Sequence, residues 1–365
     1  MGSGRFEQSQ EAFGMKLQVS APGRICLFGE HQDYFQLPVA ASAIDLRCRL
    51  RGHARSDRRV ELHLLDLDEV HTWDLDALPQ PQPRNYWLAG LHVAKKEGWL
   101  PATGWTCKVT STIPQQAGAS SSSALTVAWC ALIASLSRQA WNPSWVAQAA
   151  WRTEVEFFDE PGGMMDHAVC ASGGVQRIRF APDFRCDELP LPSGDWLLID
   201  SVEPKDTLAI LQRAKHRRMH LLQEWGADLH VGYEPPRPVH WSADDHALMN
   251  ATGGIRVVSE RGTLLLEASA HELDLGQCLT VHHRWLSEGL KVSTPRIDQL
   301  LEQAMQLGAC GGKINGSGGG GTAFAVFPRG QRARAVEAFK TQEVTVHPIA
   351  LGEEGVRIDS FAEDC

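Results

Sequence analysis

Apolar positions follow two periodicities along the chain, and each predicts a set of elements. Alternation of apolar and polar residues, or a short apolar run bounded by turn residues, predicts strands; we place them at residues 16–20, 37–44, 46–50, 106–111, 196–200 and 322–327. Pro22-Gly23 predicts a turn after the first strand. Helical spacing predicts helices at residues 86–96, with Gly98 as the stop, at 145–157 after Asn142-Pro143, and from about 207 to 226.

The length of 365 residues exceeds one ordinary domain and suits two. The buried strand at residues 196–200 precedes a charged helical segment, and we place the domain boundary just after this strand. We therefore expect an N-terminal extension or expression tag (residues 1–14), an N-terminal domain (15–200) and a C-terminal domain (201–365).

Composition narrows the class of protein. The formal charge of -9 and a pI near 5.9 argue against a general binder of nucleic acid or of anionic membranes. The longest apolar run, residues 124–136, is too short to span a bilayer, and the N-terminus lacks the apolar core of a secretory signal. The 9 cysteines show no regular spacing, which favours reduced thiols in a cytoplasmic protein.

The stretch IPQQAGASSSSALTVAW, residues 113–129, joins a loop of small residues to an apolar helix. The first N–H groups of a helix lack internal partners, and the helix dipole makes that end positive. A phosphate group can accept hydrogen bonds from these N–H groups and is attracted by the positive end of the dipole. Small side chains let the backbone wrap around such an anion, and serine hydroxyls can reach phosphate oxygens or Mg²⁺. The alternative is an ordinary serine-rich loop that caps a core helix.

Standard motifs do not explain this loop. The Walker A pattern fails around Lys313, because Leu307 and Ile314 stand where it needs glycine and serine or threonine. The glycine run at 316–321 fits a dinucleotide-binding pattern only through its composition. The serine run lacks the second glycine of a hydrolase GxSxG motif, and the zinc motif HExxH is absent from the sequence.

Three separated segments together carry a resemblance: APGRICLFGEHQDY (21–34), IPQQAGASSSSA (113–124) and GACGGKINGSGGGGT (308–322). In order and approximate spacing they resemble the motifs of galactokinase-like sugar kinases of the GHMP kinase superfamily. The resemblance implies a two-domain α+β fold, with an N-terminal domain like domain 2 of ribosomal protein S5 and a ferredoxin-like C-terminal domain. ATP would then bind between the domains.

The resemblance also implies the residues that bind the nucleotide. The phosphates would contact the serine loop and the facing glycine turn, and the adenine would lie near two aromatic residues; the full set is Gln116, Ala117, Gly118, Ala119, Ser120, Ser121, Ser122, Ser123, Gly316, Ser317, Gly318, Tyr86 and Trp87. Ser122 and Glu154 match the family's ligands of Mg²⁺. One carboxylate and one hydroxyl, completed by phosphate oxygens and water, suit the octahedral preference of this ion.

The acceptor site is implied in the same way. Asp166 would accept the proton of a sugar's anomeric hydroxyl, and Arg24 would keep that carboxylate ionised and stabilise charge on the transferred group. The sugar would contact Glu30, His31, Asp33, Gly163 and Asp166. Carboxylates accept hydrogen bonds from adjacent hydroxyls. The resemblance implies a small-molecule sugar as the partner and a monomer or homodimer as the assembly.

Two departures from the family pattern concern the phosphate loop and the sugar site. Gln116 and Ala119 replace a glycine and a leucine in the phosphate loop, and Ala214 stands where galactokinases place a tyrosine that contacts the sugar. Galactose is therefore one candidate among related sugars. A carboxylate at Glu30 would repel a uronic acid, which favours a neutral monosaccharide.

The sequence predicts an ATP-dependent sugar-1-kinase and leaves two alternatives. One is a kinase of the same fold that acts on a non-sugar alcohol such as mevalonate; the GEHQDY sequence of residues 29–34 disfavours it. The other is a catalytically silent sensor that binds sugar and ATP. Asp166, Arg24, Ser122 and Glu154 are all present, which argues against the sensor.

Overall fold

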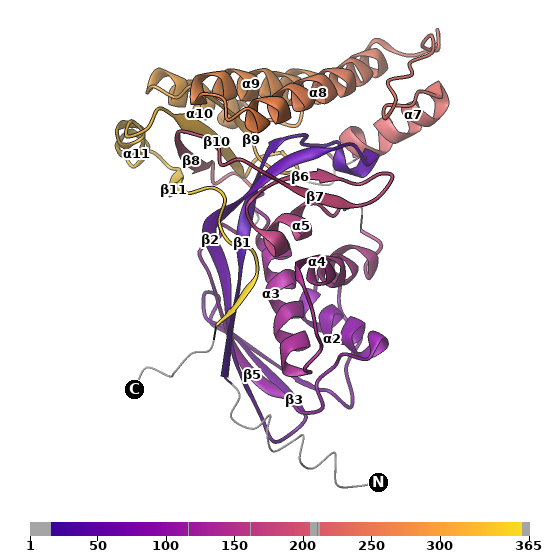
Figure 1. The fold of residues 1–365 in the computed structure, drawn as a ribbon, viewed down its shortest axis with the longest axis vertical. Coiled ribbons are helices and arrows are strands. Elements are labelled where there is room, and N and C mark those ends of the chain that lie inside the picture. The colour runs from indigo at the N-terminus through magenta and orange to yellow at the C-terminus, as the bar shows by residue number, and fades with distance from the viewer. Residues whose placement is uncertain (1–15, 116, 161, 205–209, 211, 360–365) are drawn as a thin grey trace.

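The structure, a computed structural model, describes residues 16–115, 117–160, 162–204, 210 and 212–359. Within these residues the chain forms two sheets, each covered by helices (Figure 1). The first sheet has 8 strands in the order β12-β1-β2-β5-β3-β4, with β6 paired to β2 and β7 to β6. Its strands are β1 (Lys16–Phe28), β2 (Val39–Ala54), β3 (Arg59–Leu64), β4 (Glu69–Asp74), β5 (Trp105–Ser111), β6 (Val175–Arg179), β7 (Arg185–Leu189) and β12 (Arg357–Asp359).

One face of the first sheet is covered by helices α2 (Tyr86–Glu97), α3 (Ser121–Leu136), α4 (Pro143–Trp151) and α5 (Met165–Ser172) (Figure 1). Local sequence explains their ends, since Asn85 and Asn142 accept hydrogen bonds as N-caps and Gly98 ends α2 in the left-handed conformation. Helix α3 is apolar around almost its whole circumference because it is enclosed by its neighbours. Trp129, at its centre, is fully buried.

The second sheet is antiparallel, in the order β11-β8-β10-β9. It consists of β8 (Asp195–Asp200), β9 (Gly311–Ile314), β10 (Thr322–Phe327) and β11 (Thr345–Ile349). Its helices are α7 (Arg218–Trp225), α8 (Ala243–Glu267), α9 (Glu272–Arg284), α10 (Pro295–Gln306) and α11 (Ala333–Phe339). Short helical segments are η1 (Asp33–Phe35) and η2 (Arg152–Glu156) in the first domain and η3 (Gln212–Arg217) and η4 (Trp285–Gly289) in the second. None of the helices in the described ranges is long and apolar enough to cross a membrane.

The two-domain α+β expectation is confirmed, but sheet membership divides the chain differently from the expected boundary. Strand β8 belongs to the second sheet, so the sheets separate between Leu189 and Asp195 rather than after residue 200. Strand β12 returns to the first sheet and pairs with β1. The pairing of β8 with β10 and that of β12 with β1 both join residues far apart in sequence. The expected extension, residues 1–14, lies outside the described residues.

Two local expectations need correction. Pro22-Gly23 is not a turn, because β1 runs through it with a shift of register between Pro22 and Arg24 that acts as a bulge. The helix expected at 145–157 ends at Trp151 and continues as the wider turn η2, which carries Glu154. Both irregularities lie at residues that build the site described below.

Helix α8 of the second domain packs against the first domain near Phe28 of β1. A Cβ at Gly262 would lie 2.4 Å from atoms of the Phe28 ring. Glycine at this position therefore lets the helix approach the strand closely.

We predict that Gly262→Ala lowers the free energy of unfolding by about 1–3 kcal/mol, because the added methyl group overpacks this contact. Gly253→Ala is the matched control on the same helix, where a Cβ would meet nothing within 4 Å. It should raise the free energy of unfolding by about 0.5–1 kcal/mol through helix propensity. Urea denaturation measures both; equal effects of the two substitutions would contradict the close packing.

Candidate active site

Helix α3 begins at an unusual N-cap. Ser120 adopts the left-handed conformation with φ 61°, and its side chain does not cap the helix. Instead its hydroxyl donates a hydrogen bond to Asp166 Oδ2 at 2.6 Å. The N–H groups of the first turn lack intrahelical partners, and Ser121 and Ser122 line a cavity at this end of the helix. The Ser120 side chain therefore does not cap the helix, and the N–H groups of the first turn face a cavity lined by Ser121 and Ser122.

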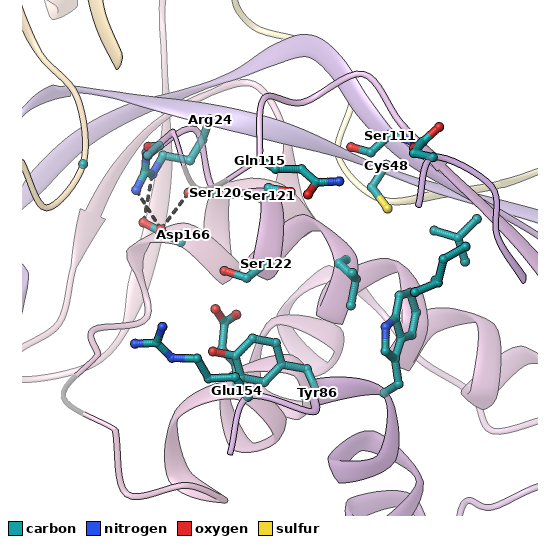
Figure 2. A pocket seen from close by; sticks show the side chains of 18 of the residues that line it. Arg24, Cys48, Tyr86, Ser111, Gln115, Ser120, Ser121, Ser122, Glu154 and Asp166 are labelled. Atoms are coloured by element: carbon teal, nitrogen blue, oxygen red, sulfur yellow. Dashed lines mark hydrogen bonds and ion pairs between the residues drawn. The ribbon is translucent and has the colours of Figure 1, made fainter. Parts of the chain in front are cut away.

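Arg24 of β1 and Asp166 of α5 form a two-pronged ion pair beside this helix end (Figure 2). The Arg24 Nε–Asp166 Oδ1 and Nη2–Oδ2 distances are 2.8 and 2.7 Å. Burial opposes ionisation of Asp166, but Arg24 and the Ser120 hydroxyl outweigh it and hold the pKa of that carboxyl below its usual value. The Asp166 side chain is 27% exposed against 5% for Arg24, so the carboxylate is the member of the pair that a ligand can reach.

Ser122 and Glu154 come together on the opposite wall (Figure 2). Burial favours the neutral form of Glu154, but His167 and a hydrogen bond from the Ser122 hydroxyl lower its pKa. His167 Nε2 lies 2.8 Å from Glu154 Oε2. Among the described residues no group of three or more His, Cys, Asp or Glu side chains forms a metal site. One ionised carboxylate and one hydroxyl nonetheless fit Mg²⁺ that takes its other ligands from phosphate and water.

The glycine-rich loop of the second domain faces the serine loop. Gly316 has φ 79°, and a Cβ there would lie 2.9 Å from the carbonyl oxygen of Gly118. That same oxygen accepts hydrogen bonds from Arg24 Nη1 at 2.5 Å and from Asn315 Nδ2 at 3.0 Å. A single carbonyl thus joins the two loops and the Arg24–Asp166 pair.

Two adjoining cavities meet at these groups. One, of about 660 Å³, extends from Ser120–Ser122 to an apolar end formed by Leu64, Leu67, Tyr86, Trp87 and Val109. The other, of about 430 Å³, extends toward Glu30, His31, Asp33 and Gly163. Both are lined by Arg24, Arg84, Glu154, Glu160, Asp166, Gly316 and Ser317. Two ligands bound in the two cavities would therefore meet at the Arg24–Asp166 pair.

Glu30 has a different environment from the one its sequence position suggests. Its Oε2 lies 2.7 Å from Lys313 Nζ, and its Oε1 accepts a hydrogen bond from the Gly316 N–H at 3.0 Å. The Lys313 and Glu30 side chains are 0% and 3% exposed. Because Lys313 neutralises this carboxylate, Glu30 gives no reason to exclude a uronic acid, and that part of the sequence argument is wrong.

His31 and Asp33 continue the substrate side of the site. His31 Nε2 lies 3.1 Å from the carbonyl oxygen of Ser317, which links this loop to the glycine-rich loop. Asp33 packs so closely on Gly163 that a Cβ there would lie 1.9 Å from Asp33 Oδ2. Burial, followed by the negative charge of Asp166, raises the pKa of Asp33 to about 6. Asp33 thus holds its proton to a higher pH than an ordinary aspartic acid does.

The structure places most of the expected nucleotide residues on the larger cavity. Gly118, Ser120, Ser121, Ser122, Tyr86, Trp87, Gly316 and Ser317 line it, while Ser123 lines the smaller one. Ala117, Ala119 and Gly318 line neither cavity and instead hold the loops in place. The Ala117 oxygen accepts hydrogen bonds from Thr322, the Ala119 oxygen accepts one from the Arg24 N–H, and Gly318 packs on the Val292 carbonyl. Gln116 lies outside the described residues.

Sequence reasoning missed four residues of the site. Lys313 and Asn315 lie among the glycines of the third motif, and this position was enough to make them candidates for the site. Arg84 and Glu160 line both cavities and form an ion pair of 3.7 Å between Nε and Oε1. Isolated charges in loops gave no sign of this pairing.

Ala214, which replaces the expected tyrosine, does not line either cavity. Its side chain is fully buried in the core of the second domain. Its carbonyl oxygen accepts a hydrogen bond from the Tyr34 hydroxyl at 2.7 Å, and Arg218 Nη1 lies 3.0 Å from the same hydroxyl. The tyrosine of the GEHQDY sequence therefore fixes this corner of the substrate loop.

Family models match three parts of the chain. Residues 85–174 match the GHMP kinases N terminal domain, residues 266–344 match GHMP kinases C terminal, and residues 7–51 match the galactokinase galactose-binding signature. The first two matches include α3 with its serine loop and the glycine-rich loop. The third match includes Arg24 and Glu30, and it begins inside the expected extension.

Relatives with two different names resemble the chain to a similar degree. A galactokinase from Pyrococcus furiosus is 28% identical over 86% of this chain and 90% of its own length. A mevalonate kinase from Pyrococcus abyssi is 25% identical over 94% of this chain and 98% of its own. The structure of Lactococcus lactis galactokinase complexed with galactose superposes with a TM-score of 0.78 over 97% of this chain and 99% of that one, at 19% identity.

We predict that Lys313→Met lowers the free energy of unfolding by about 3–5 kcal/mol, because it leaves the Glu30 carboxylate buried without its partner. The double variant Lys313→Met/Glu30→Gln should recover part of this loss. Lys340→Met is the control, since the Lys340–Glu337 pair is exposed and should contribute less than about 1 kcal/mol. Equal losses in the single and double variants, measured by urea denaturation, would show that the pair is not coupled.

The raised pKa of Asp33 predicts that Asp33→Asn increases the free energy of unfolding by an amount that depends on pH. The folded state holds the Asp33 proton more tightly than the unfolded state, so wild-type stability falls as pH rises from about 4 to the folded pKa of about 6. Asparagine removes this penalty, and the variant should gain about 3 kcal/mol at pH 7.5 but little at pH 4. Urea denaturation at the two pH values tests this; a pH-independent difference would refute the cause.

Proposed function

Because this chain belongs to the GHMP kinase superfamily, we propose that it is an ATP-dependent sugar-1-kinase. It transfers the γ-phosphate of ATP to the anomeric hydroxyl of a neutral monosaccharide, galactose or a close relative. The observation that carries the proposal is the meeting of two cavities at the Arg24–Asp166 pair beside the start of α3. A cytoplasmic setting and a monomeric or homodimeric state form part of the proposal.

The larger cavity suits the nucleotide. Its apolar end, with Tyr86 and Trp87, offers aromatic surface to the adenine, and the start of α3 offers N–H groups and a positive dipole to the phosphates. Ser122 and Glu154 would hold Mg²⁺, which neutralises phosphate charge when bound. Ser120 contributes mainly by fixing Asp166, because its hydroxyl is already used there.

Asp166 acts chiefly by position. Its lowered pKa keeps it ionised at neutral pH and makes it a weak base. It accepts a hydrogen bond from the acceptor hydroxyl, aims the oxygen at the phosphorus atom, and takes the proton as the new bond forms. Arg24 holds this carboxylate in place and adds positive charge next to the transferred group.

The charge of the smaller cavity favours a neutral sugar over mevalonate, which carries a carboxylate. Four carboxylates line it without a buried lysine partner, namely Asp33, Glu154, Glu160 and Asp166, against the two arginines Arg24 and Arg84. The match of residues 7–51 to the galactose-binding signature supports the same choice. The sensor alternative is disfavoured because Arg24, Asp166, Ser122 and Glu154 lie together around one space.

We predict ATP-dependent ADP release with at least one sugar in a panel of galactose, N-acetylgalactosamine, arabinose, fucose and a heptose. Mevalonate is included as the competing acceptor. Turnover of mevalonate without turnover of any sugar would reverse the choice of substrate. No turnover of any acceptor, by folded protein that binds ATP, would favour the sensor.

Asp166→Asn should lower kcat by about 10²–10⁴-fold while leaving the affinity for ATP nearly unchanged, because the amide cannot take the proton or hold the hydroxyl as a carboxylate does. The exposed residue Asp76 gives the matched control, Asp76→Asn, which should keep full activity. ADP release and calorimetric ATP binding are measured on the same samples. Undiminished turnover by Asp166→Asn would refute the assigned role.

A further inference from the structure

Lys313 of β9 and Glu30, which follows β1, form a fully buried ion pair between the two domains, with side chains 0% and 3% exposed. All three N–H groups of the Lys313 ammonium are in use. They donate to Glu30 Oε2 at 2.7 Å and to the carbonyl oxygens of Cys26 and Ile314 at 2.8 Å each. Lys313 therefore has no donor left for a ligand, and its ammonium serves to hold Glu30 in one place.

Both oxygens of the Glu30 carboxylate are bound within the protein. Oε2 is bonded to Lys313, and Oε1 accepts a hydrogen bond from the Gly316 N–H at 3.0 Å. Glu30 lines the smaller cavity, but with a side chain only 3% exposed it offers little surface there. A sugar hydroxyl would have to compete with a charge-assisted bond and a backbone bond. These contacts favour a role within the protein over the direct contact with sugar that the family resemblance implies.

The residue that Glu30 holds, Gly316, belongs to the turn that faces the phosphate loop. Gly316 and Ser317 line both cavities of the proposed active site. Gly316 has φ 79°, and a Cβ there would lie 2.9 Å from the Gly118 carbonyl oxygen, so its backbone packs directly against the serine loop. Glu30 therefore acts on the wall where the two cavities meet, through the N–H of Gly316.

A second connection attaches the same loop one residue earlier. The Asn315 Oδ1 atom accepts a hydrogen bond from the Cys26 N–H at 3.0 Å, and Asn315 Nδ2 donates to the Gly118 carbonyl at 3.0 Å. Asn315 thus keeps the loop attached to β1 and to the serine loop independently of Glu30. Loss of the bond between Glu30 and Gly316 should therefore release the turn that follows Asn315 without detaching the whole loop.

We propose that Glu30 is a positioning residue of the nucleotide site and not a ligand of the sugar. Through the Gly316 N–H it holds Gly316 and Ser317 where the terminal phosphate of ATP binds, and Lys313 in turn fixes Glu30. This assignment rests on the proposed function, because it takes ATP as the nucleotide. Its consequence is that loss of the acceptor for the Gly316 N–H weakens binding of ATP and spares the sugar.

Two matched double variants test this role, Glu30→Gln/Lys313→Met and Glu30→Met/Lys313→Met. Both remove the two buried charges together, and glutamine and methionine have similar length. They differ because only the glutamine carbonyl can accept the hydrogen bond from the Gly316 N–H. Calorimetric titration with Mg²⁺ and a non-hydrolysable ATP analogue should give the glutamine variant an affinity within about threefold of wild type, and the methionine variant one at least about tenfold weaker.

Titration with AMP separates positioning from a general loosening of the fold. AMP lacks the terminal phosphates, so its affinities for the two double variants should agree within about twofold. Equal weakening of AMP and of the ATP analogue by the methionine variant would overturn the positioning role. Glu30→Leu/Lys313→Met, which also lacks the acceptor, replaces the methionine variant if urea denaturation shows that it is not folded. The control is Lys340→Met/Glu337→Gln, an exposed pair whose loss should leave both affinities unchanged.

Initial rates test the sugar side separately. At saturating ATP, the KM for the sugar should differ less than about twofold between the two double variants. Equal affinities of both variants for the ATP analogue, or a KM for the sugar that rises with the methionine variant alone, would overturn the assignment and make Glu30 a sugar ligand or a purely structural residue. The expected difference in analogue affinity, with no turnover of any sugar by wild type, would contradict the proposed function and leave the role of Glu30 standing.

Discussion

The ion pair between Arg24 and Asp166 is the interaction on which the arrangement of the site depends. It joins the edge of β1 to the first turn of α5, while Arg24 Nη1 and Asn315 share the Gly118 carbonyl. One guanidinium therefore fixes the Asp166 carboxylate, for which we propose the catalytic role, the serine loop and, through Asn315, the glycine-rich loop of the other domain. Burying such charges is costly, and only complete hydrogen bonding makes the arrangement favourable. The carboxylate keeps one exposed side, which is where an acceptor hydroxyl can bind.

The remaining carboxylates of the site lie in different surroundings. His167 and Ser122 keep Glu154 ionised, as a metal ligand requires, and Lys313 neutralises Glu30 in a fully buried pair. Asp33 forms no comparable ion pair with any residue that the structure describes, and its pKa is raised to about 6. The buried Asp33 carboxyl lowers the free energy of unfolding at neutral pH and gives the substrate side of the site a polar group, a combination that is common at functional sites.

Local features of the sequence predicted the elements that local physics determines. Asn85, Gly98 and Asn142 mark helix ends through their own hydrogen bonds and backbone preferences, and the small residues before α3 mark the loop that leads into this helix. What the sequence alone could not supply are pairings between distant residues. Lys313 and Glu30 are 283 positions apart, and β12 returns to β1 from the far end of the chain. The bulge at Pro22 read as a turn because a proline–glycine pair favours both, and only the pairing with β2 decides between them.

The central claim is that the terminal phosphate of ATP binds at the start of α3, next to the hydroxyl that Asp166 orients. A crystal structure of the protein with Mg²⁺, a non-hydrolysable ATP analogue and a sugar that it phosphorylates tests this most directly. The account predicts the γ-phosphate on the N–H groups of Ser121 and Ser122, the metal between Ser122 and Glu154, and the sugar's anomeric oxygen within hydrogen-bond distance of Asp166. A nucleotide bound elsewhere, or a sugar with no contact to Asp166, would contradict it.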